Sequence, residues 1–572
     1  MFDTLITGGT VVDGSGGDRF RADVAIVGDR IAAIGEDLGP AERVIDAGDR
    51  LVTPGWVDIH THYDGQVTWD PQMSPSSWHG VTTVVMGNCG VGFAPVRADQ
   101  HDFLIQLMEG VEDIPGAALA EGLTWGWETF PEYLDAVDRL PRAIDVGTQV
   151  PHGAMRAYVM GRRGADNEPA TASDIAEMAR ITREALEAGA LGVSTSRTRL
   201  HRAKSGAPVP GTSAEVDELY GIGDALGAAG HGVFQMATDL DEADLEWMRQ
   251  ITQATGRRVM FSVVQHDGDP ESCRRMLAAC REDRAAGGLL TPMVAQRPSG
   301  VLMSWEGTAN PFMAYAGYRE IAHLEPAERL ARLAQPSVRA SILGNPPDMS
   351  SWFGLAGLIS RGFHRQYRLG DPPDYEPEPS TSLAAIAERA GRPAAEVAYD
   401  TMMENDGRGL IYLPFLDYVD GDFESLRERM DDPVSVFGLS DGGAHCGVIC
   451  DVSTPTYLLT YWARDRTRGD RLPLERLVAK QTRQTALVYG LEDRGLLAPG
   501  MKADLNVIDF ENLTLHAPSM AYDLPAGGRR LVQRADGYDV TMCSGEVIFE
   551  AGEPTGALPG RLVRGPQANP VG

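Results

Sequence analysis

The sequence predicts an α/β protein: a (β/α)8 barrel of the TIM type with a small β-sandwich domain built from both chain ends. Three observations support this prediction. Eight short apolar segments alternate with helical stretches, histidine or acidic side chains follow the first and last of these segments, and turn-rich strand patterns occur at both ends of the chain. Strands that alternate with helices indicate βα units and a parallel sheet, and eight such strands are enough to close a barrel.

The chain divides into three parts by this pattern. Residues 1–54 and 491–572 contain short strands separated by glycine-rich and proline-rich turns, and we expect the two segments to form one β-sandwich. Residues 55–490 contain the barrel. The predicted barrel strands lie at 55–60, 82–87, 144–150, 191–196, 232–237, 259–264, 289–295 and 434–440.

Two further segments of the barrel region have a predicted role. Residues 173–188 show the apolar spacing of a helix, with Ser173 as the expected N-cap and Gly189 at the end. The stretch from about 297 to 430 is too long for a simple connection, and insertions at strand ends of a barrel lie over the active-site face. We expect this insertion to form a lid or a pocket wall.

Composition limits the classes of partner and compartment. The 51 Lys and Arg residues against 81 Asp and Glu residues give a formal charge of −30, which disfavours nucleic acid and anionic membranes as partners. The six cysteines show no CxxC spacing, residues 1–12 have a strand pattern unlike a signal peptide, and no apolar run reaches the roughly 18 residues that cross a bilayer. We expect a cytoplasmic protein with a small-molecule substrate, and homo-oligomers remain open.

His60 and His62 give the strongest chemical signal. They follow an apolar strand, and because strand side chains alternate with period two, both project to one side and can share a metal ion. Two histidines at this spacing also occur by chance or on surface strands. Asp441 ends the last predicted strand, where barrels carry catalytic acids, although an Asp-Gly turn has the same pattern. Cys89 follows the second strand as a zinc ligand or as an inert buried thiol.

Polar side chains near other strand ends are candidates for substrate contact. Arg197, Arg199 and His201 follow the fourth strand, where they can bind a carboxylate or stabilise an oxyanion, and a solvated basic loop is the alternative. His201 is the best candidate for a catalytic role in this loop. The other candidates are His152, after the third strand, and His445, four residues after the late aspartate.

Four strings, TPGWVDIHTHYDG, HGVTTVVMGNCGVGFAPVR, LSDGGAH and DRGLLAPGMKADLNVIDF, occur in this order and resemble those of the amidohydrolase superfamily. Within it the chain is similar to the D-aminoacylases, the N-acyl-D-amino-acid deacylases, from the first strands to about residue 560. The resemblance implies a (β/α)8 barrel with a β-sandwich from both ends and one or two zinc ions. It also implies that His60, His62 and Asp441 bind metal, that Cys89 matches the family's cysteine ligand, and that Asp441 is the general base.

The family's histidines after the fifth and sixth strands are matched only in part. The fifth-strand segment has no histidine at its end, because His231 precedes the strand. His266 follows the sixth strand, where it is either a metal ligand or a loop residue. The arginine that follows the late aspartate in D-aminoacylases has no match. One metal ion and two metal ions both remain open.

We therefore expect a metal-dependent hydrolase that cleaves the C–N bond of a linear amide, foremost an N-acyl (D-)amino acid or a related N-acyl compound. The metal would activate water, and Asp441 would carry the proton to the leaving nitrogen. The alternatives are hydrolysis of a cyclic amide or deamination of a ring on the same fold, and a non-catalytic scaffold that has lost the metal.

Overall fold

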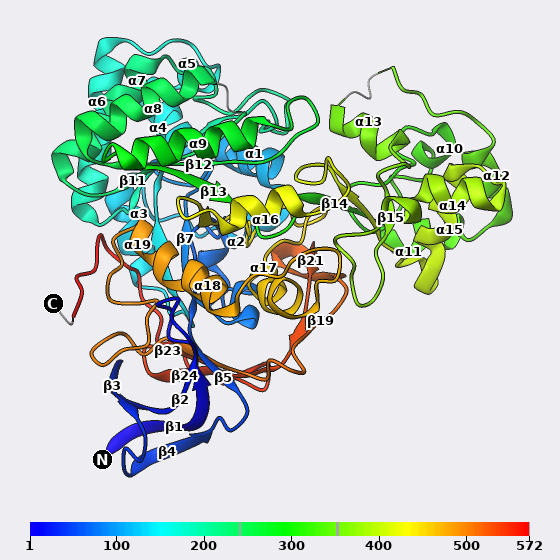
Figure 1. Cartoon of the computed structure of the whole chain (residues 1–572). Coiled ribbons are helices and arrows are strands. Elements are labelled where there is room, and N and C mark those ends of the chain that lie inside the picture. Colours follow the sequence, from blue (N-terminus) through cyan, green and yellow to red (C-terminus); the bar gives the residue numbers. More distant parts are fainter. Residues whose placement is uncertain (240–241, 351–353, 571–572) are drawn as a thin grey trace.

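The computed structural model describes residues 1–239, 242–350 and 354–570. Figure 1 shows three parts: a core of strands covered by helices, a mixed β-sheet at the end of the molecule that carries the N-terminus, and an insertion of helices that projects to one side. Among the described residues, no helix is both long enough and apolar enough to span a membrane.

The core contains all eight predicted strands, each parallel to its neighbours, and one of them is divided in two at Gln149. Their side chains are almost all buried, which explains the apolar runs in the sequence. The strands are β6 (Trp56–Asp58), β7 (Val81–Met86), β8 (Asp145–Thr148) with β9 (Val150–Pro151), β10 (Gly192–Arg197), β11 (Val233–Thr238), β12 (Arg258–Ser262), β13 (Leu290–Val294) and β17 (Val436–Phe437).

The core strands pair as two parallel sheets. One has the order β17-β13-β12-β11-β10-β9 and the other has the order β6-β7-β8. The sheets adjoin where β8 and β9 are separated by Gln149, and again where Thr61 and Gly442 form a single parallel bridge. In the described part of the chain the strands therefore do not form one continuous closed ladder, because β6 and β17 meet only beyond their ends.

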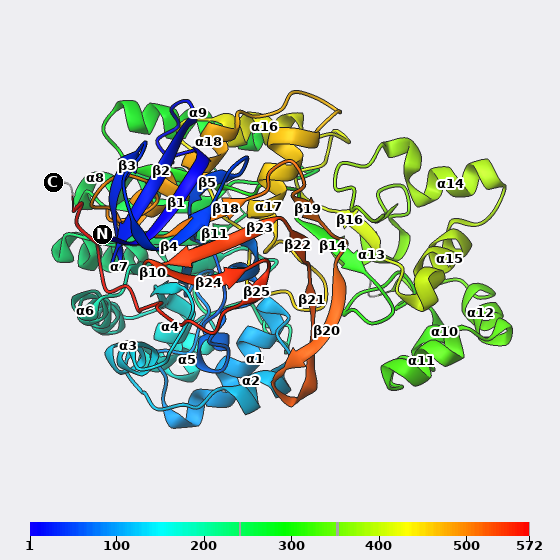
Figure 2. The ribbon, with the colours of Figure 1, turned by 90° about the horizontal axis from the view of Figure 1, so that it is seen from below.

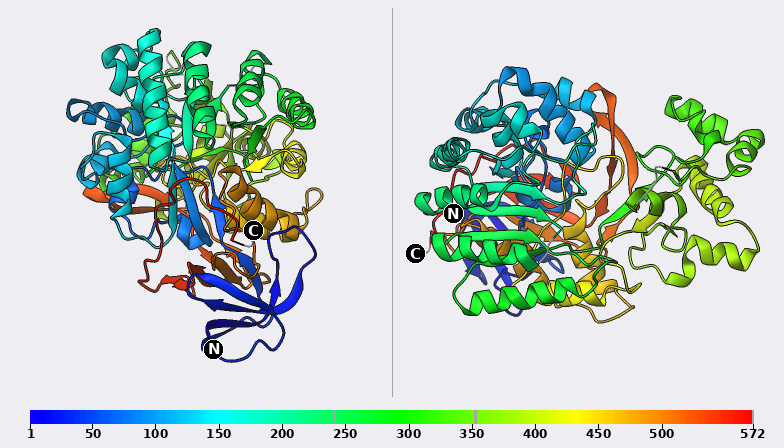
Figure 3. Two further views of the ribbon diagram at one scale, coloured as in Figure 1. Left: turned by 90° about the vertical axis from the view of Figure 1, so that its left-hand side faces the viewer. Right: turned by 90° about the horizontal axis from the view of Figure 1, so that it is seen from above.

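Helices cover the outer side of the core strands (Figure 1, and Figure 3, left). The helix predicted at 173–188 is α6 (Ala172–Ala188), and it ends at Gly189 as expected, with a φ of 115°. Its N-cap is Thr171 and not Ser173. The Thr171 hydroxyl accepts from the Asp174 N–H while the Asp174 carboxylate accepts from the Thr171 N–H, a reciprocal cap that Ser173, inside the first turn, cannot make.

The remaining helices outside the insertion are α1 (His101–Glu112), α2 (Gly116–Gly122), α3 (Phe130–Asp138), α4 (His152–Met160), α5 (Arg162–Ala165), α7 (Val216–Ala229), α8 (Glu242–Thr255), α9 (Ser272–Ala285), α16 (Glu424–Asp431), α17 (Thr454–Tyr457), α18 (Leu474–Ala479) and α19 (Thr485–Val488).

Both chain ends contribute strands to one nine-stranded sheet. Its order is β25-β24-β23-β18-β5-β1-β2-β3, with β4 beside β1, and the N-terminal strand β5 pairs antiparallel with the C-terminal strand β18. Figure 2 shows the two ends of the chain side by side in this sheet. The strands are β1 (Phe2–Val11), β2 (Phe20–Val27), β3 (Arg30–Gly35), β4 (Ala41–Asp46), β5 (Leu51–Pro54), β18 (Leu505–Ile508), β23 (Tyr538–Cys543), β24 (Glu546–Glu550) and β25 (Glu553–Pro554).

The insertion expected at 297–430 has its own sheet and its own apolar core. Strands β14, β16 and β15 pair antiparallel, and aromatic rings of Trp305, Phe312 and Tyr399 pack together beside them. Figure 3, right, shows the insertion standing beside the core. Its elements are β14 (Gly300–Met303), α10 (Ala316–Arg319), α11 (Pro326–Leu333), α12 (Pro336–Leu343), α13 (Gly354–Arg361), β15 (Tyr367–Arg368), α14 (Leu383–Ala390), α15 (Ala394–Gly407) and β16 (Ile411–Pro414).

A buried group of charges joins the core to the C-terminal part of the chain. Asp145 on β8 accepts from the Arg494 guanidinium at 2.7 Å and lies 3.0 Å from the Lys502 ammonium. Burial alone would raise the pKa of Asp145, but Lys502 and Arg494 outweigh it and lower the pKa to about 2. The carboxylate is therefore ionised at neutral pH, and it neutralises cations that have been removed from water.

We expect Asp145→Ala to lower the free energy of unfolding by about 3 kcal/mol, because it leaves two buried cations without one of their carboxylates. Asp135→Ala is the matched control, since Asp135 is exposed and pairs with Arg564 on the surface; we expect it to cost less than about 1 kcal/mol. Urea unfolding at neutral pH measures both. Equal losses in the two variants would contradict this account of the Asp145 group.

Candidate metal centre

Two histidines project to one side from the segment that follows β6. The Thr61 hydroxyl and N–H both donate to the carbonyl of Val85 on β7, at 3.0 and 3.1 Å, so Thr61 points toward the neighbouring strand. His60 and His62, one residue away on each side, point the other way, into the interior, and both are 1% exposed. The Asp58 carboxylate accepts from the His60 N–H at 3.2 Å and from the Ser440 hydroxyl, which holds this segment against the segment that follows β17.

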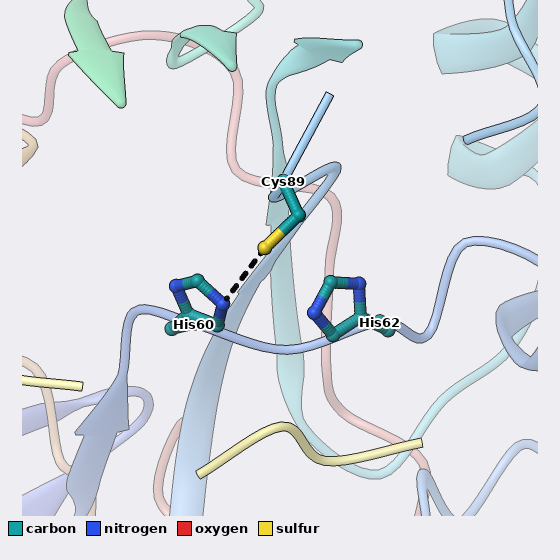
Figure 4. A group of neighbouring side chains, drawn as sticks. All are labelled: His60, His62 and Cys89. Atoms are coloured by element: carbon teal, nitrogen blue, oxygen red, sulfur yellow. Dashed lines mark hydrogen bonds between the residues drawn. The ribbon is translucent and has the colours of Figure 1, made fainter. Parts of the chain in front are cut away.

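Cys89 brings a sulfur atom to the same place from the segment after β7. Its backbone has a φ of 55°, in the left-handed region that non-glycine residues seldom adopt, and its N–H donates to the Gln235 side chain at 3.1 Å. The Cys89 Sγ lies 3.4 Å from the His60 Nε2 (Figure 4). One donor atom from each of His60, His62 and Cys89 lies within 4.8 Å of the others.

Asp441 adds an oxygen atom from the segment after β17. Its Oδ1 lies 3.2 Å from the His60 Nε2 and 3.6 Å from the His62 Nε2. Asp441 also has a φ of 50°, and its N–H donates to the His60 carbonyl at 3.1 Å. A backbone hydrogen bond between the segments that follow the first and last core strands therefore brings His60 and Asp441 together.

These separations fit the donor set of a tetrahedral zinc ion. Zinc bonds of about 2.0 to 2.3 Å place neighbouring donors about 3.3 to 3.6 Å apart. Three of the six separations among the four donors, 3.4 Å from sulfur to nitrogen and 3.2 and 3.6 Å from oxygen to nitrogen, lie close to this range. Two imidazoles, a thiol and a carboxylate are also the ligand types that zinc prefers.

The pKa values of these groups describe the site before an ion binds. Burial lowers the pKa of His62 to about 4, so its imidazole is neutral at pH 7. Burial raises the pKa of the Cys89 thiol well above its usual value, and the negative charges of Glu112 and Asp441 add to this effect. Burial opposes ionisation of Asp441, but the neighbouring imidazoles of His60 and His62 hold its pKa well below the usual range. Only the thiol must lose a proton for these three groups to bind a cation.

Glu112, the last residue of α1, lies beside the site and is absent from the candidates found in the sequence. It is 1% exposed, and its Oε1 lies 3.3 Å from the His62 Nδ1 while its Oε2 lies 3.6 Å from the His445 Nε2. The sequence offers no signal for it, because Glu112 belongs to an ordinary amphipathic helix and does not follow a core strand.

A cavity of about 530 Å³ opens beside these donors. Of the residues expected at the site, His201, His266, Arg199 and His445 also line it, together with His60, His62, Cys89 and Asp441. The His201 Nδ1 lies 3.0 Å from the Ser196 hydroxyl, and burial lowers the pKa of His201 to about 3.

The expectation that His266 is a metal ligand is not supported, because the described donor group contains only His60, His62 and Cys89. β12 ends at Ser262, so His266 lies four residues beyond the strand, in the loop. β11 ends at Thr238, which lines the cavity where a fifth-strand histidine was sought, and His231 precedes that strand as predicted.

Two residues expected to contact substrate do not line the cavity in the described part of the chain. His152 is the first residue of α4 and is fully buried, with its ring nitrogens 2.9 Å from the Thr195 hydroxyl and 2.7 Å from the Glu218 carboxylate. The Arg197 guanidinium donates to the Ala214 carbonyl at 2.9 Å. Neither side chain is among the lining residues and each has other partners in the protein, so the prediction that they contact substrate is not supported.

The far wall of the cavity is apolar. It combines residues from the loop after β12, from α9, from the insertion helix α13 and from the end of β16. The insertion therefore forms part of the pocket wall, as predicted. The apolar lining residues are Leu200, Ala237, Val263, Val264, Met276, Leu355, Leu358, Phe415, Leu416 and Leu439.

Comparisons with known proteins identify related sequences and a related fold. The sequence profile described as the amidohydrolase family matches residues 43–549. An N-acyl-D-glutamate deacylase of Alcaligenes xylosoxydans xylosoxydans is 30% identical over 576 residues, covering 98% of this chain and 96% of that protein. An N-acyl-D-aspartate deacylase of the same organism is 28% identical over 585 residues, covering 98% and 95%. The crystal structure of a D-aminoacylase matches with a TM-score of 0.65 at 25% identity, covering 99% of this chain and 100% of that one.

We expect His152→Ala to lower the free energy of unfolding by about 2 to 4 kcal/mol, because it opens a cavity and removes a hydrogen bond from the buried Glu218 carboxylate. His516→Ala is the control, since His516 is 41% exposed and pairs with an exposed aspartate; it should change the value by less than about 0.5 kcal/mol. Urea unfolding measures both variants. A stability of the His152 variant within error of wild type would mean that this buried contact has been misjudged.

Proposed function

We propose that this chain, which belongs to the amidohydrolase family, hydrolyses the C–N bond of an N-acyl compound with the help of one zinc ion. A single observation carries the proposal: four donor atoms, from His60, His62, Cys89 and Asp441, converge at the edge of a cavity large enough for a small substrate. Two proteins that resemble the chain over nearly its whole length are named as deacylases of N-acyl amino acids, and a deacylase cleaves a bond of this type.

The proposed scaffold is a (β/α)8 barrel. Support comes from the eight parallel strands, from the bridge between Thr61 and Gly442 that brings the first and last strands together, and from the D-aminoacylase whose structure matches. The proposed ligands all follow the carboxyl ends of strands, which is where barrel enzymes carry their active sites.

The proposed ion is zinc, and the proposed number is one. Cysteine and histidine donors favour zinc over harder ions such as magnesium. A second ion would need further donors, and on the side of β11 the described chain offers Thr238 in place of a histidine. When bound, zinc polarises an amide carbonyl and makes water more acidic.

Asp441 is the proposed proton carrier. It is ionised before the reaction, and it lines the cavity beside both imidazoles, so it can accept a proton from the attacking water and then donate it to the leaving nitrogen.

His201 is the proposed oxyanion donor. If the Ser196 hydroxyl donates to the His201 Nδ1, the proton of the neutral ring is on Nε2, available to the cavity.

The cavity also supports a proposal about the substrate's shape. Arg199 is the single Lys or Arg among the described residues that line it, so we propose that it meets the carboxylate of an N-acyl amino acid. The rest of the substrate would lie against the apolar wall. A second carboxylate, as in N-acyl-D-aspartate or N-acyl-D-glutamate, would find no second cationic side chain among those lining residues.

Zinc binding provides the first test. At pH 7 we expect purified protein to bind about one zinc per chain and to release at least one proton, because the Cys89 thiol is protonated before binding and becomes a thiolate. Elemental analysis gives the stoichiometry, and calorimetry in two buffers of different ionisation enthalpy gives the proton count. The His60→Ala/His62→Ala variant should bind none, and Cys89→Ser should release about one proton fewer than wild type.

A well-folded wild-type protein that stays empty after zinc is supplied would reject the proposed function and favour a non-catalytic scaffold. Two zinc ions per chain would reject the single-ion site while keeping the hydrolase.

The second test addresses Asp441. We expect Asp441→Asn to lower kcat by about 100-fold to 10,000-fold on N-acetyl-D-leucine, because asparagine keeps an oxygen donor but cannot carry a proton. Zinc content is measured in the same samples, so that loss of the ion is not mistaken for loss of the base.

Wild-type protein should also prefer N-acetyl-D-leucine to N-acetyl-D-glutamate in kcat/KM. The reverse preference would refute the proposed fit to the apolar wall, and full activity of Asp441→Asn would refute the base.

A further inference from the structure

Glu112 is a buried carboxylate that the proposed mechanism does not use. It ends α1, a helix that contributes no other residue to the lining of the cavity, and it is 1% exposed. In the described part of the chain no Lys or Arg pairs with it: its recorded ion-pair partners are the imidazoles of His62 and His445. A buried carboxyl group needs hydrogen-bond partners, and the groups that face Glu112 are the imidazoles of His62 and His445.

The position of Glu112 relative to His62 indicates what Glu112 does at the site. The His62 Nε2 faces the Asp441 Oδ1 at 3.6 Å, on the side of the proposed ion, while the His62 Nδ1 faces the Glu112 Oε1 at 3.3 Å. Both His62 nitrogens and the Glu112 Oε1 are buried, and none of them has a hydrogen-bond partner of good geometry. The His62 Nδ1 and the Glu112 Oε1 therefore lie close together without a hydrogen bond of good geometry between them. Histidines that bind metals through one nitrogen usually donate the other N–H to a carboxylate.

The same end of α1 also fixes the segment that carries Asp441. The Glu112 carbonyl accepts from the His445 N–H, and the Asp113 carboxylate accepts from the Gly447 N–H at 2.9 Å. His445 has a φ of 52°, so these contacts hold a backbone conformation that is costly for a non-glycine residue. Glu112 thus contacts His62 through its side chain, and its carbonyl binds the loop that carries Asp441.

We propose that Glu112 is a positioning residue, which accepts a hydrogen bond from the His62 Nδ1–H and so directs the His62 Nε2 at the metal ion. It is not proposed as a ligand, because its carboxylate lies at the Nδ1 of the His62 ring, whereas the Asp441 oxygen faces the Nε2. The inference rests on the proposed zinc site.

The test compares Glu112→Ala and Glu112→Gln with wild type and with Glu109→Gln. Glu109 is on the same helix and pairs at the surface with Lys204, so its variant controls for a changed charge on α1. We expect Glu112→Ala to weaken zinc binding about 10-fold to 100-fold in competition with a chromogenic chelator. Glu112→Gln should lose less than 10-fold, because the amide oxygen still accepts from His62. Glu109→Gln should bind as wild type does.

Two further measurements separate positioning from general support of the fold. The visible spectrum of the Co²⁺-substituted protein should shift in Glu112→Ala and not in Glu109→Gln, because the ligand field reports the direction of the His62 ring. The free energy of unfolding of the metal-free protein should change little in Glu112→Ala, because the Glu112 Oε1 has no hydrogen-bond partner there to lose.

Several outcomes would overturn the inference. Zinc affinity and the Co²⁺ spectrum of Glu112→Ala equal to those of wild type would remove any role at the site. Loss of all zinc binding in Glu112→Gln would make Glu112 a ligand. A less stable metal-free Glu112→Ala with unchanged zinc affinity would make it a structural residue. A wild-type protein that binds no zinc would reject the proposed function together with this inference, whereas the other results would leave that function standing.

Discussion

The site depends on the hydrogen bonds that join the segments after the first and last core strands. The His62 N–H donates to the Gly442 carbonyl at 2.7 Å, and the Asp441 N–H donates to the His60 carbonyl. The separation of His60 from Asp441 along the chain is nearly 400 residues, yet their side chains meet because these backbones pair. The rest of the core supports this pairing. The intervening strands separate β6 from β17 along the chain, and the outer helices pack against these strands.

The backbone at the site is unusual in a consistent way. Cys89, Asp441 and His445 all have φ near 50°, although none is a glycine. Residues in this conformation are held there by their surroundings, and they concentrate where function requires an exact side-chain direction. Here the surrounding contacts are specific: the Gln235 side chain holds Cys89, the His60 carbonyl holds Asp441, and the end of α1 holds His445.

The sequence predicts the parts of this structure that depend on local periodicity. All eight core strands lie where apolar runs predict them, and the period of two correctly places His60 and His62 on one side. The shared sheet of the two chain ends also follows from their turn-rich strand patterns. The details that failed depend on competition between neighbours: Thr171 caps α6 in place of Ser173, and His152 turns toward Glu218 instead of the cavity. Glu112 could not be predicted, because a helix carries it to the site from outside the strand ends.

The sheet formed by both chain ends affects how the chain folds during synthesis. Strands β1 to β5 are made first, and β5 pairs with β1 on one edge, but its partner on the other edge is β18, which begins at residue 505. At a synthesis rate of about 5 to 20 residues per second, the edge of β5 stays unpaired for tens of seconds while the core between them is made. An open strand edge is a template for pairing with other chains. The nascent protein therefore passes through a period in which crowded ribosomes or the absence of chaperones would favour aggregation, and this period ends only when the last tenth of the chain emerges.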